Sequence, residues 1–473
     1  MWMAADYHCR AVDAKRPHRL ESTPVDWRRF QSKLIAGAIL LGLLAACGPS
    51  AAADSLVFRK QMVRVIIIDA ALNRLTNEAT YGQPDPEDLL EARKFLASRY
   101  SDAVRMHATG VQLMNFDRAY LELALELAEQ HQLKLYPWLD AAHGYARDGD
   151  TDSGQSPADE VIQWRKQYSS PALGGLSTTD EPPLDRIAHL AVYHAALRQH
   201  WPEAIPVPIL VGFDRATRYI EECNPRILVY DCYPLYQASL VSRVSESPPG
   251  DVSVAWDTGD IWELYDQLRA QMGPERPIWP VIQAFGYHPG QDETYNWRIP
   301  LPAEVKLQAY GLTALGAEGI WYFVYAPGSP PNDWLALVET PGKLTHLGHA
   351  VSDINERLAR VAPILERVQP MPAEERARRI QVGRPHVAGV FTDPDDPQRL
   401  IIAAVNGIML AEQRLSIRYF AEDRKLQNVA ALDSDDAQLS AIQNELGWVT
   451  IATPNVGPGE LILLEMRMIP PPD

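Results

Sequence analysis

Residues 63–70 read VRVIIIDA, an apolar run rich in β-branched side chains that ends with a carboxylate at Asp69. Such a run is typical of a parallel strand that is buried on both faces. The next periodic segment, residues 86–100, repeats its leucines and its phenylalanine at helical spacing. A buried strand followed by an amphipathic helix predicts a βα unit, and the same alternation continues along the chain.

Eight such units follow one another. Strands are expected at 63–70, 103–108, 133–140, 172–181, 207–212, 227–234, 277–286 and 319–327, and helices at 86–100, 119–132, 160–168, 184–201, 216–224, 261–273, 303–316 and 349–368. This succession predicts an α/β fold, a (β/α)8 TIM barrel over residues 62–368. An open doubly wound sheet is the alternative, but no glycine-rich dinucleotide fingerprint follows the first strand.

The pattern changes after residue 368. Residues 369–379 combine prolines with a run of charges and are expected to form a linker. Residues 380–473 hold short β-prone runs separated by Pro, Asp and Gly, with one helix-like exception at 435–446. They predict a small C-terminal antiparallel β-sandwich, which we expect to pack on the barrel rather than to bind glycan.

The amino-terminal region has the pattern of an export signal. Arg28, Arg29 and Lys33 precede LIAGAILLGLLAAC at 34–47, whose apolar part is too short to span a bilayer comfortably. This pattern predicts a signal peptide over residues 1–46. Its ending resembles the lipobox of bacterial lipoproteins, which implies a lipid on Cys47, a tether over 47–61 and a place in the cell envelope, with the outer membrane favoured. An ordinary signal peptide with a chance cysteine is the alternative.

Charge and cysteine content exclude some partners and one covalent link. The formal net charge of −17 disfavours nucleic acid, because phosphate backbones would be repelled. Beyond the leader and Cys47, the sequence has two cysteines, Cys223 and Cys232. The strand expected between them separates its ends by roughly 20 Å, which is beyond the reach of a disulfide. We therefore expect no bridge.

The functional residues of such a barrel lie where strands end and βα loops begin. Those positions are rich here in carboxylates and aromatic rings, a combination that binds a sugar by its C–H face and its rim of hydroxyls. The alternative for each aromatic residue is that it fills the barrel interior. Candidate substrate-binding residues are Asp69, Arg105, His107, Trp138, Asp140, Tyr233, Gln283, Tyr287, Trp321 and Tyr325.

Four motifs at strand ends resemble one group of enzymes. They are Asp-Glu-Pro at 180–182, YDCYP at 230–234, PIWPVIQAFG at 277–286 and GAEGIWYFVYAP at 316–327. Together they resemble the β-galactosidase-type glycoside hydrolase barrels of clan A. The resemblance covers most of residues 60–368 and implies a carbohydrate substrate. It also implies that Glu181 is the acid/base, with Asp180 at a position where the group usually has Asn.

The resemblance breaks at strand seven. The group has a nucleophilic glutamate at its end, where this chain has Gln283, and an amide cannot form the glycosyl-enzyme ester. Asp231 on strand six is the best substitute carboxylate, followed by Asp292 and Glu293, and a separation of about 6.5–9.5 Å between the two carboxyl groups would suit an inverting mechanism. Alternatively, a substrate group replaces the second carboxylate, or the barrel binds glycans at the cell surface without hydrolysis.

Asp180 and Glu181 are consecutive, so on a strand they point to opposite sides. We expect Glu181 to face the cleft as the general acid, with its pKa raised by burial. Asp180 would then hold a neighbouring group by hydrogen bonds. The alternative is that one of the two is an acidic partner for the start of the helix expected at 184–201.

Other enzyme classes lack their motifs. A metal hydrolase barrel needs a His-rich set, often after strand one, where this chain reads IIIDA, so no metal is expected. The sequence contains no Gly-x-Ser-x-Gly nucleophile elbow. The loops AFGYHPGQ and APGSPP are too rich in proline and aromatic residues for phosphate binding. No cofactor is expected.

Overall fold

The computed structural model describes residues 61–69, 85–114, 118–138, 156–235, 254–255, 259–288, 297–327, 334–432 and 439–470. The chain divides into two compact units, Met1–Arg59 and Lys60–Asp473, and every described residue belongs to the second. The expected signal peptide and Cys47 lie outside the described residues.

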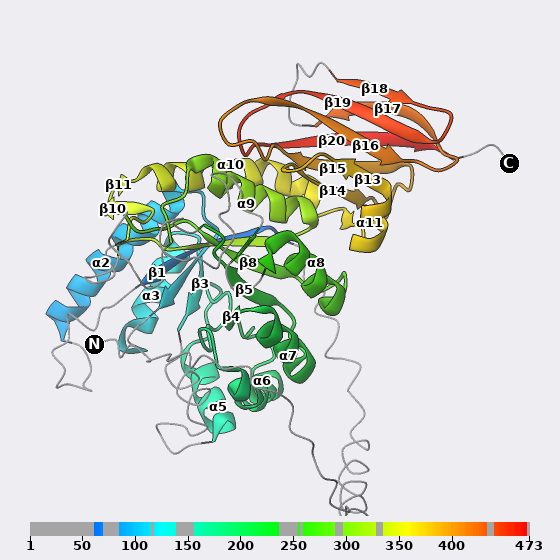
Figure 1. The fold of residues 1–473 in the computed structure, drawn as a ribbon. Helices are drawn as coiled ribbons and strands as arrows, with labels where there is room; N and C mark the ends of the chain where they lie inside the picture. Colours follow the sequence, from blue (N-terminus) through cyan, green and yellow to red (C-terminus); the bar gives the residue numbers. More distant parts are fainter. Residues whose placement is uncertain are drawn as a thin grey trace, which may run out of the picture. The chain divides into compact units, whose positions relative to one another are not determined.

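A curled parallel sheet forms the first part of this unit (Figure 1). Its strands are β1 (Val63–Asp69), β2 (Gly110–Met114), β3 (Lys134–Pro137), β4 (Ile209–Val211), β5 (Leu228–Cys232), β8 (Ile278–Gln283) and β9 (Gly319–Phe323). They lie in the order β3-β2-β1-β9-β8-β5-β4. Strand β9 pairs directly with β1, so the last parallel strand along the chain lies beside the first.

The segment expected as strand four lies between the two edges of this sheet. Isolated parallel bridges join Leu173 and Ser177 to the β3 side, at Leu135 and Trp138. Further bridges join Leu176 to Pro206 and Asp180 to Ile209, on the β4 side. Residues 173–180 therefore contact both edge strands of the sheet.

Each strand or bridging segment is followed by a helix, as a βα series requires. The helices are α2 (Pro86–Arg105), α3 (Leu121–Gln130), α5 (Pro157–Gln167), α6 (Ile187–His200), α7 (Phe213–Cys223), α8 (Ile261–Met272), α9 (Pro302–Leu315) and α10 (His346–Leu365), with short 3-10 turns η2 (Arg118–Tyr120) and η3 (Leu184–Arg186). Local sequence sets several of their starts. Asp85 caps α2 by accepting from the backbone N–H groups of Glu87 and Asp88.

The second strand lies later in the chain than its sequence predicts. Residues 103–108 were expected to be this strand, but α2 continues through Arg105 and β2 begins at Gly110. The buried residues Leu96, Tyr100 and Ala103 are spaced by four and three positions, so the helical stripe continues through the expected strand. Arg105 and His107 consequently precede β2, at the amino end of the sheet.

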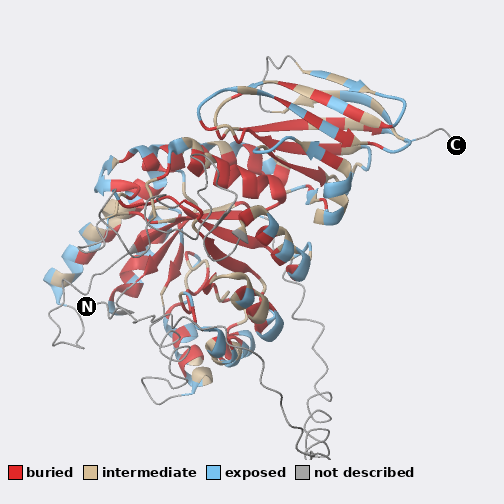
Figure 2. Ribbon diagram, in the orientation of Figure 1, coloured by how far each residue is buried: buried red, intermediate tan, exposed pale blue. Residues whose placement is uncertain are grey.

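The strands of the parallel sheet are largely buried (Figure 2), and their alternating side chains belong to two different hydrophobic clusters. Even-numbered residues of β1 pack with the helices, whereas Val65 and Ile67 belong to a cluster drawn from strand residues and their connections alone. That second cluster is the inner face of the curled sheet. There the indole rings of Trp279 and Trp321 stack at 6.1 Å between centroids, and Tyr136 lies 5.0 Å from Trp321.

Residues beyond α10 form two antiparallel sheets. One has the order β12-β14-β15-β20-β17 and the other β13-β16-β19-β18. Their strands are β12 (Gln369–Pro370), β13 (Ile380–Val382), β14 (Val387–Thr392), β15 (Arg399–Val405), β16 (Gln413–Phe420), β17 (Lys425–Ala431), β18 (Ser440–Gln443), β19 (Trp448–Val456) and β20 (Leu461–Ile469). Val390, Ile402, Ile417 and Leu464 from both sheets share one hydrophobic core, the arrangement of a β-sandwich.

Shorter elements complete the described chain. They are the two-stranded pairs β6 (Val254–Ala255) with β7 (Gly259–Asp260) and β10 (Val338–Thr340) with β11 (Lys343–Leu344), and the helix α11 (Ala373–Arg379). Helix α11 and β12 occupy the segment expected as a linker, and β18 lies within the helix-like exception. The boundaries of the domains remain predictions.

The sheet that contains β14 is buried on its other face as well. Phe391, Ile401 and Ala403 belong to the same core as residues of α9 and α10. Gly389 lies so close to α9 that an added Cβ would be 1.7 Å from the carbonyl oxygen of Ala314. The Lys306 ammonium lies 2.6 Å from the carboxylate of Glu460, which adds an ion pair to this contact.

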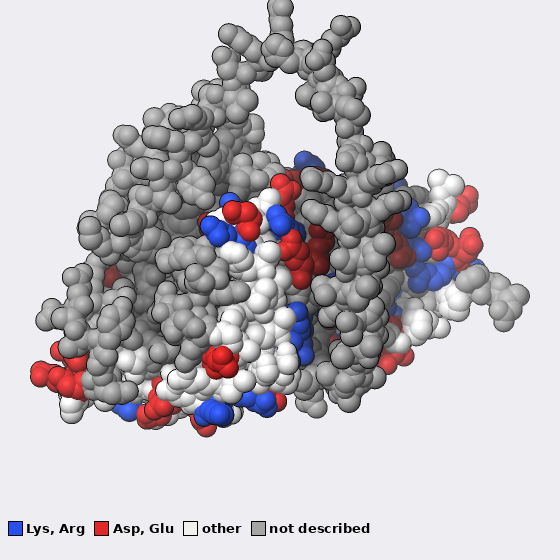
Figure 3. Space-filling view, turned by 90° about the horizontal axis from the view of Figure 1, so that it is seen from below, with Lys and Arg blue, Asp and Glu red and all other residues white. Residues whose placement is uncertain are grey.

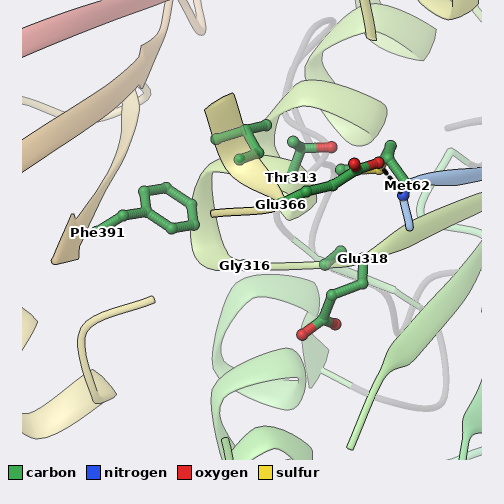
Figure 4. A pocket seen from close by; sticks show the side chains of 8 residues that line it. Met62, Thr313, Gly316, Glu318, Glu366 and Phe391 are labelled. Carbon is green, nitrogen blue, oxygen red and sulfur yellow. Dashed lines mark hydrogen bonds between the residues drawn. The ribbon is translucent and has the colours of Figure 1, made fainter. Parts of the chain in front are cut away.

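A small cavity lies at the amino end of the parallel sheet (Figure 4). Met62 and Glu318, which precede β1 and β9, line it together with Glu366, Gly316 and Phe391. The Met62 backbone N–H donates to the Glu366 carboxylate at 3.0 Å. This is the opposite end of the strands from the predicted site, so the cavity does not bear on the chemistry considered below.

Candidate functional site

Asp231 lies at the carboxyl end of β5 and is 2% exposed. Its strand neighbours are Val211 of β4 and Val281 of β8. Ile227, Val229 and Val281 belong to the inner-face cluster, so strand alternation puts the Asp231 side chain on the inner face too. The structure thus places a buried carboxyl where the sequence predicted one.

Strand four brings Asp180 and Glu181 to the same end of the sheet. The Glu181 backbone N–H donates to the carbonyl of Ile209 at 2.9 Å, which attaches the pair to β4. The Glu181 side chain is exposed, whereas Asp180 is partly buried. This reverses the expected burial of the pair. Glu181 also has a φ of 41°, in the left-handed region that a glutamate rarely adopts and that strained functional residues often occupy.

Tyr233 follows Asp231 by two residues and is partly exposed. Its pKa is raised well above the ordinary value, first by burial and then by the charges of Asp231, Glu181 and Asp180. Acidic groups from two different strands therefore act on one phenol. On the face seen from below in Figure 3, acidic and basic side chains are interspersed over the described part.

Asp180 is expected to make stability fall as pH rises. Burial, together with the neighbouring Glu181 carboxylate, raises the pKa of Asp180 to about 8, against about 3.9 in an unfolded chain. Between these values the folded state keeps a proton that the unfolded state releases, so its contribution to stability is lost from about pH 4 to about pH 8. Asp180→Asn removes this titration.

The measurement is the urea midpoint of unfolding for wild type and Asp180→Asn at five pH values from 5 to 9. The variant is expected to gain on wild type as pH rises and to keep a constant advantage above about pH 8. Asp353→Asn, on the exposed side of α10, is the matched control and should show a constant difference. A constant difference for Asp180→Asn as well would contradict the raised pKa.

Gln283 ends β8 on the inner face and is fully buried. Its side-chain oxygen accepts from the Leu235 N–H at 2.8 Å. Its amide nitrogen donates to the carbonyls of Leu235, Arg298 and Phe285 at 3.1, 3.1 and 3.3 Å. At the expected nucleophile position, both the oxygen and the nitrogen of the side-chain amide are therefore hydrogen-bonded to backbone groups.

The structure adds an aromatic cluster that sequence analysis did not single out. Phe285 is buried at its centre, with Tyr233, Trp297 and Phe323 at 5.2, 5.2 and 4.9 Å between ring centroids. Trp334 lies 5.8 Å from Phe285. Tyr233, Trp297, Phe323 and Trp334 are all partly exposed. The motif that could have identified part of the cluster is YNWRIP at 295–300, an aromatic loop after strand seven.

Other predicted binding residues lie away from these carboxyl groups. The Arg105 guanidinium, at the end of α2, donates to Asp102 at 3.0 Å and to the carbonyl of Gly342 at 2.9 Å. His107 lies in the turn before β2 with a φ of 53°. Both are corrections to the predicted site, because the expected strand 103–108 is helix and turn, at the amino end of the sheet.

Three predicted aromatic residues are buried. Trp321 is 0% exposed and packs inside the sheet against Trp279. The Tyr325 hydroxyl donates to the Asp102 carboxylate at 2.7 Å, so this ring packs toward α2. Tyr287 is 3% exposed, with its ring 5.8 Å from Trp334. Burial leaves Trp321 and Tyr325 no open ring face for a sugar.

The remaining predicted residues lie at the edge of what the structure describes. Trp138 follows β3, bridges Ser177 and is partly exposed. Asp69 ends β1, but its side chain is outside the described part. Asp140, Asp292 and Glu293 also lie outside the described residues. Cys223 and Cys232 are buried and are not joined by a disulfide.

Two searches of the described residues found nothing. No group of three or more His, Cys, Asp or Glu side chains in the described ranges is placed to hold a metal ion. Within the same part of the chain, no helix has the length and apolar character needed to cross a membrane.

Comparison with known proteins gives similarity at the level of the fold. The sequence matches no family profile and no curated protein. Gan42B, a GH42 β-galactosidase, superposes with a TM-score of 0.54 at 7% identity, over 86% of this chain and 98% of that one. A Paenibacillus sp. cycloisomaltooligosaccharide glucanotransferase gives 0.51 at 8% identity, over 87% and 86%.

A β-galactosidase from the psychrophilic Marinomonas ef1 has a TM-score of 0.46 at 11% identity, over 65% of this chain and 62% of that chain. The present chain thus spans about three fifths of that enzyme's length. At identities this low, the two superpositions above 0.5 speak to the fold alone. The chain therefore shares its fold with Gan42B and with the Paenibacillus glucanotransferase.

Proposed function

We propose that this protein is a glycoside hydrolase on a closed (β/α)8 barrel, acting on an oligo- or polysaccharide. Bridges from residues 173–180 to both edges of the parallel sheet support closure. The fold of the chain is one that Gan42B, a GH42 β-galactosidase, also has. The observation that carries the proposal is the position of Asp180, Glu181 and Asp231 at the carboxyl ends of their strands, the end of a barrel where active sites lie.

In the proposed mechanism, Glu181 is the acid that protonates the glycosidic oxygen, because its side chain is exposed at a strand end. The raised pKa of Asp180 keeps a proton on Asp180 itself at neutral pH. Asp231 is the base that activates a water on the other side of the sugar ring. Because Gln283 provides no nucleophilic carboxylate, this arrangement predicts inversion of configuration at the anomeric carbon.

The test uses protein that lacks residues 1–51, incubated with a panel of neutral oligo- and polysaccharides. New reducing ends report cleavage, and proton NMR reports which anomer forms first. We expect the inverted anomer, and Asp231→Asn is expected to lower kcat about 10²–10⁴-fold. Asp353→Asn is the control with unchanged kcat.

Retention of configuration would contradict the role of Asp231 as the base. Binding of a glycan without cleavage, by wild type, would replace the hydrolase with the alternative function, a glycan-binding protein at the cell surface. Gln283 is the residue that favours this alternative, because it stands where a hydrolase of the resembling group has its second catalytic carboxylate.

We also propose that the protein is attached to the bacterial cell envelope by a lipid on Cys47. The lipobox-like ending at 44–47, after a basic and then an apolar segment, supports this proposal. The check is fractionation of cells that express the full chain. Wild type is expected in the membrane pellet, and recovery of Cys47→Ser in the same pellet would contradict the anchor.

A further inference from the structure

The side chain of Gln283 is a brace between three separate stretches of backbone. It holds Leu235, beyond β5, through both its oxygen and its nitrogen. It also holds the carbonyls of Phe285 and Arg298, from the start and the end of the loop after β8. The contacts with Leu235 and Phe285 are buried and the contact with Arg298 is partly buried. Their loss would be costly, because it would leave buried polar groups without a partner.

Each braced residue adjoins a ring of the aromatic cluster. Leu235 lies two positions after Tyr233, Arg298 directly follows Trp297, and Phe285 is itself the central ring. The rings of Tyr233, Phe285 and Trp297 form a closed triangle with centroid separations of 5.2, 5.2 and 5.5 Å. Their interplanar angles of 86°, 75° and 85° are the edge-to-face geometry that aromatic pairs prefer.

The far side of the brace is anchored to a helix. The Arg298 guanidinium donates to the Glu304 carboxylate with two nitrogens, and Glu304 is 0% exposed at the start of α9. The Gln308 side chain, one turn further, accepts from the backbone N–H of Gln283 at 3.1 Å and donates to its carbonyl at 3.3 Å. The backbone of Gln283 is thus held by α9, while its side-chain amide holds the two loops.

The position requires an amide. Three carbonyl oxygens face its nitrogen, so the group there must donate hydrogen bonds, and an ionised carboxylate only accepts them. A glutamate at this position would direct negative charge at three carbonyl oxygens. The residue that departs from the expected nucleophile therefore has a structural requirement of its own.

We propose that Gln283 is a positioning residue, which sets the partly exposed rings of Tyr233 and Trp297 as a wall for the C–H face of a sugar. The inference rests on the proposed function for the identity of the ligand. The wall begins close to Asp231 along the chain, because Tyr233 lies two residues after it, just beyond the end of β5. Rigid rings would hold a stacked sugar in one reproducible orientation.

The experiment compares Gln283→Glu with Asn406→Asp, both in protein that lacks residues 1–51. Asn406 is the matched control: it is also fully buried, and its amide also holds backbone, donating to Ala411 and Val456 and accepting from Ile408. It lies in the C-terminal sheets, away from the wall. Both variants are expected to lose stability by similar amounts.

Only Gln283→Glu is expected to change the near-UV circular dichroism of the tryptophans, and to raise KM about tenfold or more while kcat changes less. A near-UV spectrum identical to wild type would overturn the positioning role, whether or not any glycan is cleaved. If Gln283→Glu gains hydrolysis with retention of anomeric configuration, the positioning role is overturned too. The glutamate would then act as a nucleophile, and the position would belong to the catalytic site. If the spectrum of Gln283→Glu changes but wild type binds no glycan, Gln283 still positions the rings and the proposal of a sugar as their ligand is overturned.

Discussion

Glu181→Gln is expected to lower the rate of glycosidic cleavage by about 10²–10⁴-fold, the usual contribution of a general acid. The substitution keeps the size and hydrogen-bonding shape of the side chain and removes its proton. Glu181 is exposed at the end of strand four, and its backbone N–H is bonded to Ile209, so the change should leave the fold intact. The measurement is kcat on the best substrate of the panel, with thermal unfolding to verify folding.

A second substitution at the same residue separates function from stability. Glu181 has a φ of 41°, a conformation that costs an ordinary residue about 1–2 kcal/mol and costs glycine almost nothing. Glu181→Gly is therefore expected to be inactive yet at least as stable as wild type. The relief of strain is partly offset by about 0.5–1 kcal/mol, because glycine gives the unfolded chain more conformational freedom. Loss of activity without loss of stability would show that the strained glutamate is kept for catalysis and not for folding.

The control for this pair is Gln132→Gly. Gln132 has a φ of 57° and is exposed in the turn after α3, far along the chain from the site. It should gain stability by the same relief of strain and keep full activity. Cleavage by Glu181→Gln at the rate of wild type would remove Glu181 from the mechanism and leave Asp180 as the acid to test next.

Gly389→Ala is expected to destabilise the protein by about 3 kcal/mol or more, the upper end of what overpacking costs. The new methyl group would lie 1.7 Å from the Ala314 carbonyl oxygen and 2.7 Å from its carbon. Both atoms are backbone of α9, so no side-chain rotation can make room. The antiparallel sheet and α9 would have to separate, and with them the core that contains Phe391 and Ile401.

The matched control is Gly383→Ala in the same C-terminal region. A Cβ at Gly383 would meet nothing within 4 Å, and the residue is exposed, so little change in stability is expected. Urea and thermal midpoints of both variants provide the comparison. Equal midpoints would mean that the C-terminal sheets do not depend on their contact with α9.

Sequence periodicity was sufficient for most of the βα series because both of its signals are local. A strand buried on both faces needs a continuous apolar run, and a helix needs a repeating stripe, whatever the rest of the chain does. Strand two is the exception. Residues 103–108 have short apolar spacing that fits a strand, yet they extend the helical stripe of α2, and a helix that is already formed adds a turn at little cost.

The carboxyl groups at strand ends were also accessible from sequence, because the end of an apolar run marks its own position. Asp231 and the Asp180–Glu181 pair lie at the carboxyl ends of their strands, as the sequence predicts. The relative burial of Asp180 and Glu181 was not accessible. It depends on the turn of the backbone at Glu181 and on the chain packed around it.

The sequence by itself determined the βα alternation, the change to antiparallel strands after residue 368, and the acidic residues at the strand ends. Only tertiary structure decided which aromatic rings face the site: Trp321 fills the interior, whereas Phe323, two residues later, belongs to the partly exposed cluster. It also decided that Gln283 braces three loop segments. The physical reason is range: apolar periodicity acts over a few residues, whereas a buried amide finds its partners, and a ring its exposed edge, only where distant segments meet.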